Sequence, residues 1–243
     1  MLKAPDHRTN RLLAALAPED FALLEPNLEI VELSRGEVLY ETGDVMRFAY
    51  FPHNAIVALV NMMEDGSTVE VAMFGREGVM GLLSSLVTKQ AFGRFIVQMS
   101  GMASRMSIEG LNEIRNVRPD LRQLIMNYGE AFLSATFQRV SCNAVHPVDA
   151  RCCRWILSVH DRAEGDVLLL THEFLSEMLG VQRPTVSIVL RTLQTAALIQ
   201  QSRGGITVTD REGLEERACE CYGKIRRIYE RLLPGTYSHT GDR

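Results

Sequence analysis

The residue types that could do chemistry in this 243-residue chain gather between Thr171 and Leu193. The segment reads THEFLSEMLGVQRPTVSIVLRTL. Glycine can leave a helix at positive φ and proline suits a first helical turn, so Gly180 and Pro184 predict a tight turn between two helices. Thr171 could cap the first helix, and apolar residues recur at spacings of three and four in both. Helix, tight turn and helix is the arrangement in which the second helix can enter the major groove of DNA.

The side chains left on the outer face of the second helix are of the types that contact DNA. Arginine can donate two hydrogen bonds to guanine, and hydroxyls reach phosphates. No Asp or Glu lies between Glu177 and Asp210, so this strip favours DNA although the formal net charge of the chain is −4. Two short strands around the glycine tip after Arg203 predict a wing. The predicted DNA contacts are Thr171, Gln182, Arg183, Thr185, Ser187, Arg191 and Arg203.

Two further regions must position this element. From Leu28 to Ser107, short apolar stretches with period-two patterning alternate with glycine and proline turn signals, which indicates a compact antiparallel barrel or jelly roll. Asp65-Gly66 predicts a hairpin turn. We therefore expect an α+β fold with an N-terminal antiparallel, jelly-roll-like β-roll, a long dimerisation helix and a C-terminal winged helix-turn-helix.

The long helix is predicted to begin at Pro119 and to extend to about residue 145. At that length it would run on the order of 35 Å, which is too long for the barrel alone to cover. We expect it to pair with its copy in a second subunit, although packing only on its own barrel is an alternative. The predicted seam, with spacings of three and four, is Leu121, Leu124, Tyr128, Ala131, Ala135, Gln138, Cys142 and Val145.

These features together resemble the Crp/Fnr family of transcriptional regulators over roughly residues 12–213. The DNA-binding half carries the resemblance most specifically, in the pattern LxxxLGVxRxTVS from Leu175 to Ser187. The β-roll half matches in Gly36-Glu37-Val38-Leu39-Tyr40, Gly43-Asp44, Asp65-Gly66 and Gly78-x-x-Gly81. The resemblance implies a cyclic-nucleotide-binding-like β-roll over 11–118, a dimerisation helix over 119–145, a winged helix-turn-helix over 146–213, and a C-terminal helix and tail over 214–243.

The resemblance also implies base-reading positions at Arg183, Pro184 and Ile188. Arg183 is the guanine-reading arginine of the family. The other two positions are often glutamate and arginine in the family but are apolar here. We therefore expect a half-site that differs from that of the best-known members.

The effector pocket that the resemblance implies departs from the family pattern. Gly81 matches the glycine of the phosphate cradle, but Leu82 stands where a ribose-binding glutamate is expected. No arginine occurs between residues 83 and 93. Cyclic AMP is therefore not expected to bind in the usual way, and either another small ligand or no ligand remains open. The candidate pocket residues are Gly81, Leu82, Leu83, Ser84, Arg94 and Thr136.

The five cysteines, at positions 142, 152, 153, 219 and 221, include no Cys-x-x-Cys pair. We expect reduced, partly buried thiols and no metal site. Two redox roles stay open: Cys142 could form a disulfide between subunits, and Cys152-Cys153 could act at a hinge. His53 could be an axial haem ligand but is more often a structural residue, and the N-terminus lacks the cysteines of an iron–sulfur version.

Other function classes fit the sequence less well. No apolar run reaches the roughly 20 residues that span a bilayer, and no apolar leader is present, so we expect a cytoplasmic protein. No catalytic cluster, P-loop or nucleophile elbow is found, so we do not expect an enzyme. We expect a sequence-specific regulator, homodimeric on near-palindromic duplex DNA, with RNA polymerase as a further partner. The alternative is a ligand-binding or redox- or gas-sensing module of the same fold, in which DNA binding is secondary.

Overall fold

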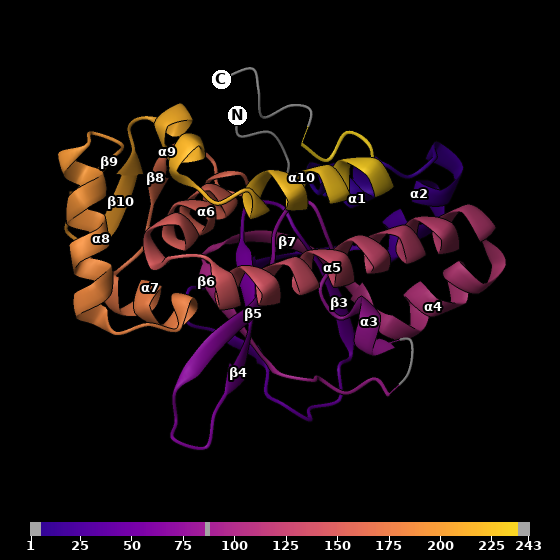
Figure 1. The fold of residues 1–243 in the computed structure, drawn as a ribbon. Helices are drawn as coiled ribbons and strands as arrows, with labels where there is room; N and C mark the ends of the chain where they lie inside the picture. Colours follow the sequence, from indigo (N-terminus) through magenta and orange to yellow (C-terminus); the bar gives the residue numbers. More distant parts are fainter. Residues whose placement is uncertain (1–5, 86–87, 238–243) are drawn as a thin grey trace.

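The computed structural model describes residues 6–85 and 88–237, and its N-terminal half is an antiparallel β-roll (Figure 1). One sheet has the strand order β1-β7-β3 and the other the order β2-β6-β4-β5. The hairpin predicted at Asp65-Gly66 is confirmed, because Met62 pairs with Thr68 and Gly66 has φ 83°. The strands are β1 (Glu29–Leu33), β2 (Val38–Tyr40), β3 (Phe48–Pro52), β4 (Ile56–Met62), β5 (Thr68–Phe74), β6 (Arg94–Met99) and β7 (Gly101–Ser107).

Short helices close the ends of the β-roll. The Ser107 hydroxyl accepts a hydrogen bond from the Gly110 N–H and so caps the helix that follows the last strand. Pro18 starts a helix, as its position before Glu19 and Asp20 predicts. These helices are α1 (Arg11–Ala14), α2 (Pro18–Leu24), α3 (Leu82–Ser85) and α4 (Ile108–Val117).

The long helix is α5 (Pro119–Val145), with 27 residues, and the C-terminal α10 (Cys221–Leu232) packs along it. The predicted helix is confirmed, but the prediction that its heptad seam faces a second subunit is wrong. Most of that stripe faces the protein's own core: the Tyr128 hydroxyl, for example, donates to the Val79 carbonyl at 3.1 Å, whereas Val145 at the end of the helix is 72% exposed. The seam members buried in this way are Leu121, Tyr128, Ala131, Ala135 and Cys142.

A second apolar stripe lies on the opposite, solvent-facing side of α5. It consists of Met126, Leu133, Phe137 and Val140, whose exposed fractions are 62%, 51%, 61% and 64%. Spacings of three and four identify an apolar stripe but do not say what covers it. The sequence of α5 contains two stripes, and the periodicity alone did not distinguish the face that packs on the β-roll.

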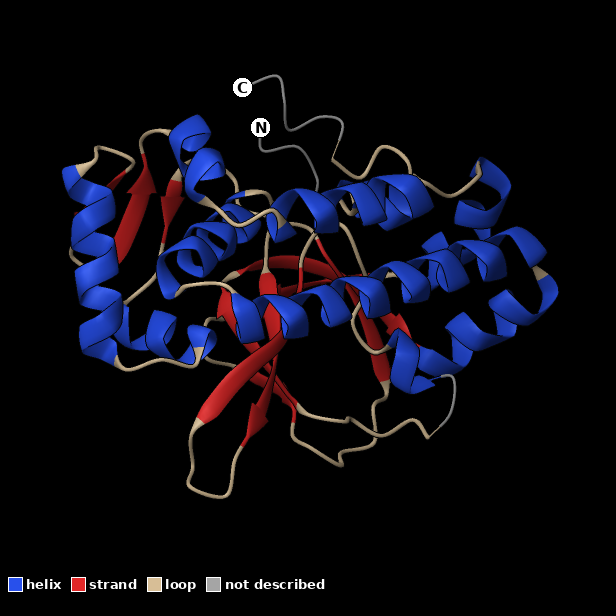
Figure 2. Cartoon of the chain, viewed as in Figure 1, coloured by secondary structure: helices blue, strands red, loops and turns tan. Residues whose placement is uncertain are grey.

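The C-terminal half is a winged helix-turn-helix, which confirms the predicted fold class. Figure 2 shows strands only in the β-roll and in a small sheet beside the helices of this half. That sheet has the order β8-β10-β9 and is antiparallel. The elements are α6 (Val148–His160), β8 (Val167–Leu168), α7 (His172–Leu179), α8 (Arg183–Thr195), β9 (Ile199–Ser202), β10 (Gly205–Val208) and α9 (Arg211–Arg217).

The two halves share buried contacts. Ile56 and Met73 of the β-roll belong to the same apolar cluster as Trp155 and Leu175, and the Trp155 Nε1 donates to the carboxylate of Glu70 at 3.2 Å. The Arg162 guanidinium pairs with Glu77 at 2.7 Å, with both side chains buried. In this arrangement the C-terminal half packs directly on the β-roll.

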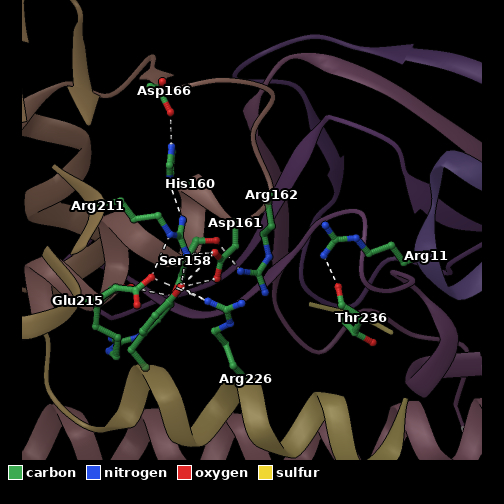
Figure 3. Close-up of polar contacts among 12 residues, drawn as sticks. Arg11, Ser158, His160, Asp161, Arg162, Asp166, Arg211, Glu215, Arg226 and Thr236 are labelled. Carbon is green, nitrogen blue, oxygen red and sulfur yellow. Dashed lines mark hydrogen bonds and ion pairs between the residues drawn. The ribbon is translucent and has the colours of Figure 1, made fainter. Parts of the chain in front are cut away.

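A polar cluster joins the end of α6 to α9 (Figure 3). Asp161 follows α6 and is buried, and its carboxylate accepts a hydrogen bond from the Arg211 guanidinium at 2.6 Å. Arg162 donates to the Ser158 carbonyl at 2.6 Å, and the His160 ring lies 2.8 Å from Asp166. These contacts hold the end of α6 against the wing sheet and α9. The predicted tail beyond residue 237 lies outside the described residues. Among the described helices, none combines the length and apolar character needed to cross a bilayer.

Candidate nucleic-acid interface

The turn between α7 and α8 is built from local backbone requirements. The Thr171 hydroxyl accepts from the Phe174 N–H at 3.2 Å and so caps α7. Gly180 ends the same helix at φ 62° and ψ 43°, a left-handed conformation that side chains disfavour. Pro184 lies in the first turn of α8, where its missing N–H has no helical partner to lose. The geometry is that of a helix-turn-helix.

The outer face of α8 lies at the edge of the molecule, next to β9 and β10 (Figure 1). Four of the predicted DNA contacts are exposed there: Gln182, Arg183, Arg191 and Arg203. Three are half-buried: Thr171, Thr185 and Ser187. Ile188 is 65% exposed, whereas the inner stripe of Val186, Val189, Leu190 and Leu193 is buried.

Two of the half-buried hydroxyls already have partners within the protein. The Thr171 hydroxyl caps α7, and the Ser187 hydroxyl donates to the Arg183 carbonyl at 3.1 Å. The His172 ring contacts both the Ser187 hydroxyl, at 2.9 Å, and the Gln201 side-chain oxygen, at 2.8 Å. His172 therefore connects α8 to β9 of the wing, a role that the sequence analysis missed because the two partners lie 15 and 29 residues away.

The surface is not free of carboxylates, contrary to the expectation drawn from the strip between Glu177 and Asp210. Glu173, in the first turn of α7, brings its Oε2 to 3.6 Å from the Nε of Arg183. Both side chains are about two-thirds exposed, at 68% and 65%. An exposed ion pair of this kind contributes only about 0–1 kcal/mol. Arg183 can therefore leave Glu173 and contact a nucleic acid at a small cost in free energy.

Four of the six candidate effector residues meet at one place in the β-roll. Gly81, Leu82, Leu83 and Ser84 line a cavity of about 10 Å³ together with aromatic side chains that include Tyr128. A cavity of this size holds about one water molecule. The side chains that line it carry no charge.

The remaining two candidate effector residues lie elsewhere. The Arg94 Nε pairs with Glu41 at 2.8 Å on the outside of the β-roll. The Thr136 hydroxyl donates to the Phe132 carbonyl within its own helix. Alternation along β6 explains the position of Arg94, because its neighbour Phe95 takes the inward face.

Two of the cysteines and His53 have the surroundings of buried residues with a structural role. Cys152 and Cys153 are buried in α6, and burial raises the pKa of both thiols, for Cys153 to about 11. The His53 Nε2 lies 2.8 Å from the Ser104 hydroxyl, and burial lowers the pKa of this histidine to about 4. This nitrogen of His53 is thus occupied by a hydrogen bond.

The other three cysteines lie together with His146 at the C-terminal end of α5. Cys142 is fully buried there and does not lie on the exposed stripe of that helix. A disulfide between subunits through Cys142 is therefore not compatible with this arrangement. The sequence signal for the cluster was a Cys-x-x-x-His spacing, which places both side chains on one helix face. The cluster contains no Cys-x-x-Cys pair, and its other two ligands lie more than 70 residues further along the chain.

Comparison with known proteins agrees with this architecture. Residues 150–217 match the family model described as a Crp-like helix-turn-helix domain. The chain is 24% identical over 201 residues to the global nitrogen regulator of Synechococcus elongatus, a match that covers 78% of this chain and 90% of that protein.

Solved structures show the same fold at low identity. FixK2 from Bradyrhizobium japonicum has a TM-score of 0.69 and 14% identity, covering 79% of this chain and 98% of that one. A CRP-family transcriptional regulator from Thermus thermophilus has a TM-score of 0.65 and 17% identity, covering 77% of this chain and 96% of that one.

Proposed function

Because residues 150–217 match a Crp-like helix-turn-helix domain and the chain shares the fold of solved regulators, we propose that it is a transcriptional regulator of the Crp/Fnr family that binds duplex DNA as a homodimer, with α8 of each protomer in a major groove. The family regulates transcription through DNA binding, and its members are not enzymes. A two-fold symmetric dimer reads a near-palindromic site whose half-sites lie about 34 Å apart, one helical turn of DNA. RNA polymerase is the further partner that we propose at a promoter.

The observation that carries this proposal is the exposed N-terminal turn of α8. In helix-turn-helix proteins the first residues of the second helix contact base edges. Arg183 occupies that turn with 65% of its side chain exposed, and Ile188 lies five residues further along the same helix and is also exposed. Arg183 is assigned to guanine and Ile188 to the methyl group of thymine. Arg203, at the tip of the wing, is assigned to the phosphate backbone.

The exposed stripe of α5 supports the homodimer. Met126, Leu133, Phe137 and Val140 follow one another at intervals of seven, four and three residues, the spacing of a coiled-coil seam. Large exposed apolar patches on a protein surface mark interaction sites. We propose that this stripe, in place of the buried seam expected from the sequence, pairs with its copy in the second protomer.

We propose that any effector of the β-roll binds differently from cyclic AMP in the nucleotide-binding members. The uncharged lining and the outward position of Arg94 support this, because a buried phosphate needs an arginine or oriented N–H groups. A ligand entering the cavity must displace side chains against Tyr128, and through it act on α5. Calorimetric titration with cyclic AMP is expected to give no saturable heat. Saturable binding would contradict this part of the proposal.

The DNA assignment is tested by fluorescence anisotropy on a duplex selected from a random pool. Arg183→Ala is expected to cost about 1–3 kcal/mol, or roughly 5- to 150-fold in affinity, for the selected duplex. Arg203→Ala is expected to weaken all sequences alike and to lower the salt slope by about 1. Arg227→Ala, an exposed arginine on α10, is the matched control and should bind as the parent does. Unchanged affinity for Arg183→Ala refutes the assignment.

A further inference from the structure

Four side chains that bind metals meet where α5 ends and α10 begins. Cys142 lies in the last turn of α5 and His146 caps the end of that helix, and Cys219 and Cys221 flank Glu220 at the start of α10. The four ligand atoms all lie within 4.8 Å of one another. Two of the separations are 3.4 Å, between the Sγ atoms of Cys142 and Cys219, and 3.6 Å, between the Cys221 Sγ and the His146 Nδ1.

These distances match a single tetrahedral ion. With Zn–S bonds of about 2.3 Å, two sulfurs of a tetrahedral site lie about 3.8 Å apart. Three thiolates and one imidazole are the donors of Cys₃His structural zinc sites, and they disfavour the oxygen-seeking ions Mg²⁺ and Ca²⁺. We propose that Cys142, His146, Cys219 and Cys221 bind one Zn²⁺ ion per chain as a structural site.

The groups around the cluster are arranged as zinc ligands require. The His146 Nε2 lies 3.0 Å from the Glu220 carboxylate, which leaves the Nδ1 directed at the sulfur atoms. Pairing one ring nitrogen with a carboxylate fixes the tautomer that presents the other to a metal. The Gln138 amide donates to the Cys221 sulfur at 3.0 Å.

The negative charge of the proposed site lies near two buried arginines. Three thiolates and one Zn²⁺ ion carry a net charge of about −1. Arg151 and Arg154 of α6 interact electrostatically with the sulfur of Cys142. Both arginines are buried, and in each the Nε atom has no hydrogen-bond partner. A metal–thiolate centre would add negative charge near these two buried cations, in addition to the Glu70 carboxylate that interacts with Arg154.

The place of the cluster in the chain indicates what the ion does. One ligand pair precedes the DNA-binding segment and the other follows it, so the ion would hold both ends of residues 147–218 at the C-terminal turn of α5. It would also fix α10 against α5. Zinc would therefore set the orientation of the DNA-binding half relative to the helix that carries the exposed apolar stripe. Zinc binding itself does not depend on the proposed function, whereas its effect on DNA affinity does.

The test begins with the metal content of the full-length protein, purified under reducing conditions from zinc-supplemented medium. Elemental analysis is expected to find one zinc per chain. Replacement with Co²⁺ is expected to give thiolate-to-cobalt charge-transfer absorption and the strong visible bands of tetrahedral cobalt. Because structural zinc sites bind with about 10–16 kcal/mol, less than roughly a tenth of an equivalent of zinc in folded protein overturns the proposal. A Cys142–Cys219 disulfide in the reduced preparation overturns it as well.

Variants separate zinc binding from general stability. Cys219→Ser should abolish the cobalt–thiolate bands, whereas Cys153→Ala, which removes a buried thiol outside the cluster, should keep the full zinc content. Glu220→Gln leaves all four ligands, and Glu220 is exposed, so this variant should fold. It is expected to weaken zinc about 10- to 100-fold in competition with a fluorescent chelator. Parent-like zinc affinity in both Cys219→Ser and Glu220→Gln overturns the assignment of the ligands.

The effect on DNA is measured separately. Zinc-depleted protein is expected to bind the selected duplex more weakly than zinc-loaded protein and to recover on adding zinc. If zinc binds in one equivalent but DNA affinity does not change, the proposed orienting role is wrong while the site stands. If no duplex is bound in either form, the proposed DNA-binding function fails and the zinc content still decides the site.

Discussion

Replacing Phe137 by glutamate is expected to separate the proposed dimer into monomers. A phenylalanine side chain can bury about 200 Å², and Phe137 is 61% exposed in the single chain. Each protomer therefore offers roughly 120 Å² at this position, and the two copies together offer roughly 240 Å². At about 25 cal/mol per Å², complete burial is worth about 6 kcal/mol. Burial of only half that area still gives about 3 kcal/mol, or roughly a 100-fold change in dimer affinity.

The assay is sedimentation velocity over a range of protein concentrations. The parent chain is expected to sediment as a dimer and Phe137→Glu as a monomer over most of the range. Val117→Glu is the control, because Val117 is also an exposed apolar residue, at 73%, but lies outside α5. The circular-dichroism spectrum of Phe137→Glu should match that of the parent, since Phe137 is 61% exposed within its own protomer, whereas loss of the dimer should lower the midpoint of thermal unfolding. A variant as dimeric as the parent refutes the pairing face, and a monomeric parent refutes the dimer.

Two further predictions concern stability. Burial lowers the pKa of His53 from its ordinary 6.5 to about 4, so the unfolded chain takes up a proton before the folded chain does as the pH falls. The parent should therefore lose up to about 3 kcal/mol of unfolding free energy between pH 6.5 and pH 4. Urea unfolding of His53→Gln at the same pH values should show a smaller loss. If the unfolding free energy of parent and variant falls equally with pH, His53 is not the cause. Arg162→Met is expected to cost about 3–5 kcal/mol because it leaves the buried Glu77 carboxylate without its partner, and the double change with Glu77→Leu should recover much of that loss. A double variant as unstable as the sum of its single changes would show that this pair is not coupled.

Local backbone requirements made the DNA-binding element predictable from the sequence. Gly180 has the positive φ that its place after an apolar helix predicted, and Pro184 begins the next helix. Such features depend on a few neighbouring residues, so they can be predicted from the sequence alone. The same holds for the hairpin at Asp65-Gly66.

Features that depend on long-range packing were not predictable in the same way. The spacing in α5 predicted a helix but not which of its two apolar stripes α10 and the β-roll would cover. Glu173 lies outside the acid-free strip in sequence, yet the turn of the fold brings it to Arg183. Cys142 and Cys219 are 77 residues apart and become neighbours only because α10 returns along α5.

The base-edge role of α8 is tested most directly by repeating the selection from random duplexes with the parent chain and with Arg183→Ala. We expect a two-fold symmetric motif for the parent, with half-sites about one helical turn apart. Arg183→Ala is expected to select the same motif except at one guanine in each half-site, where the preference is relaxed. A parent motif without symmetry, or a variant that retains the guanine at full strength, would contradict the placement of Arg183 on a base.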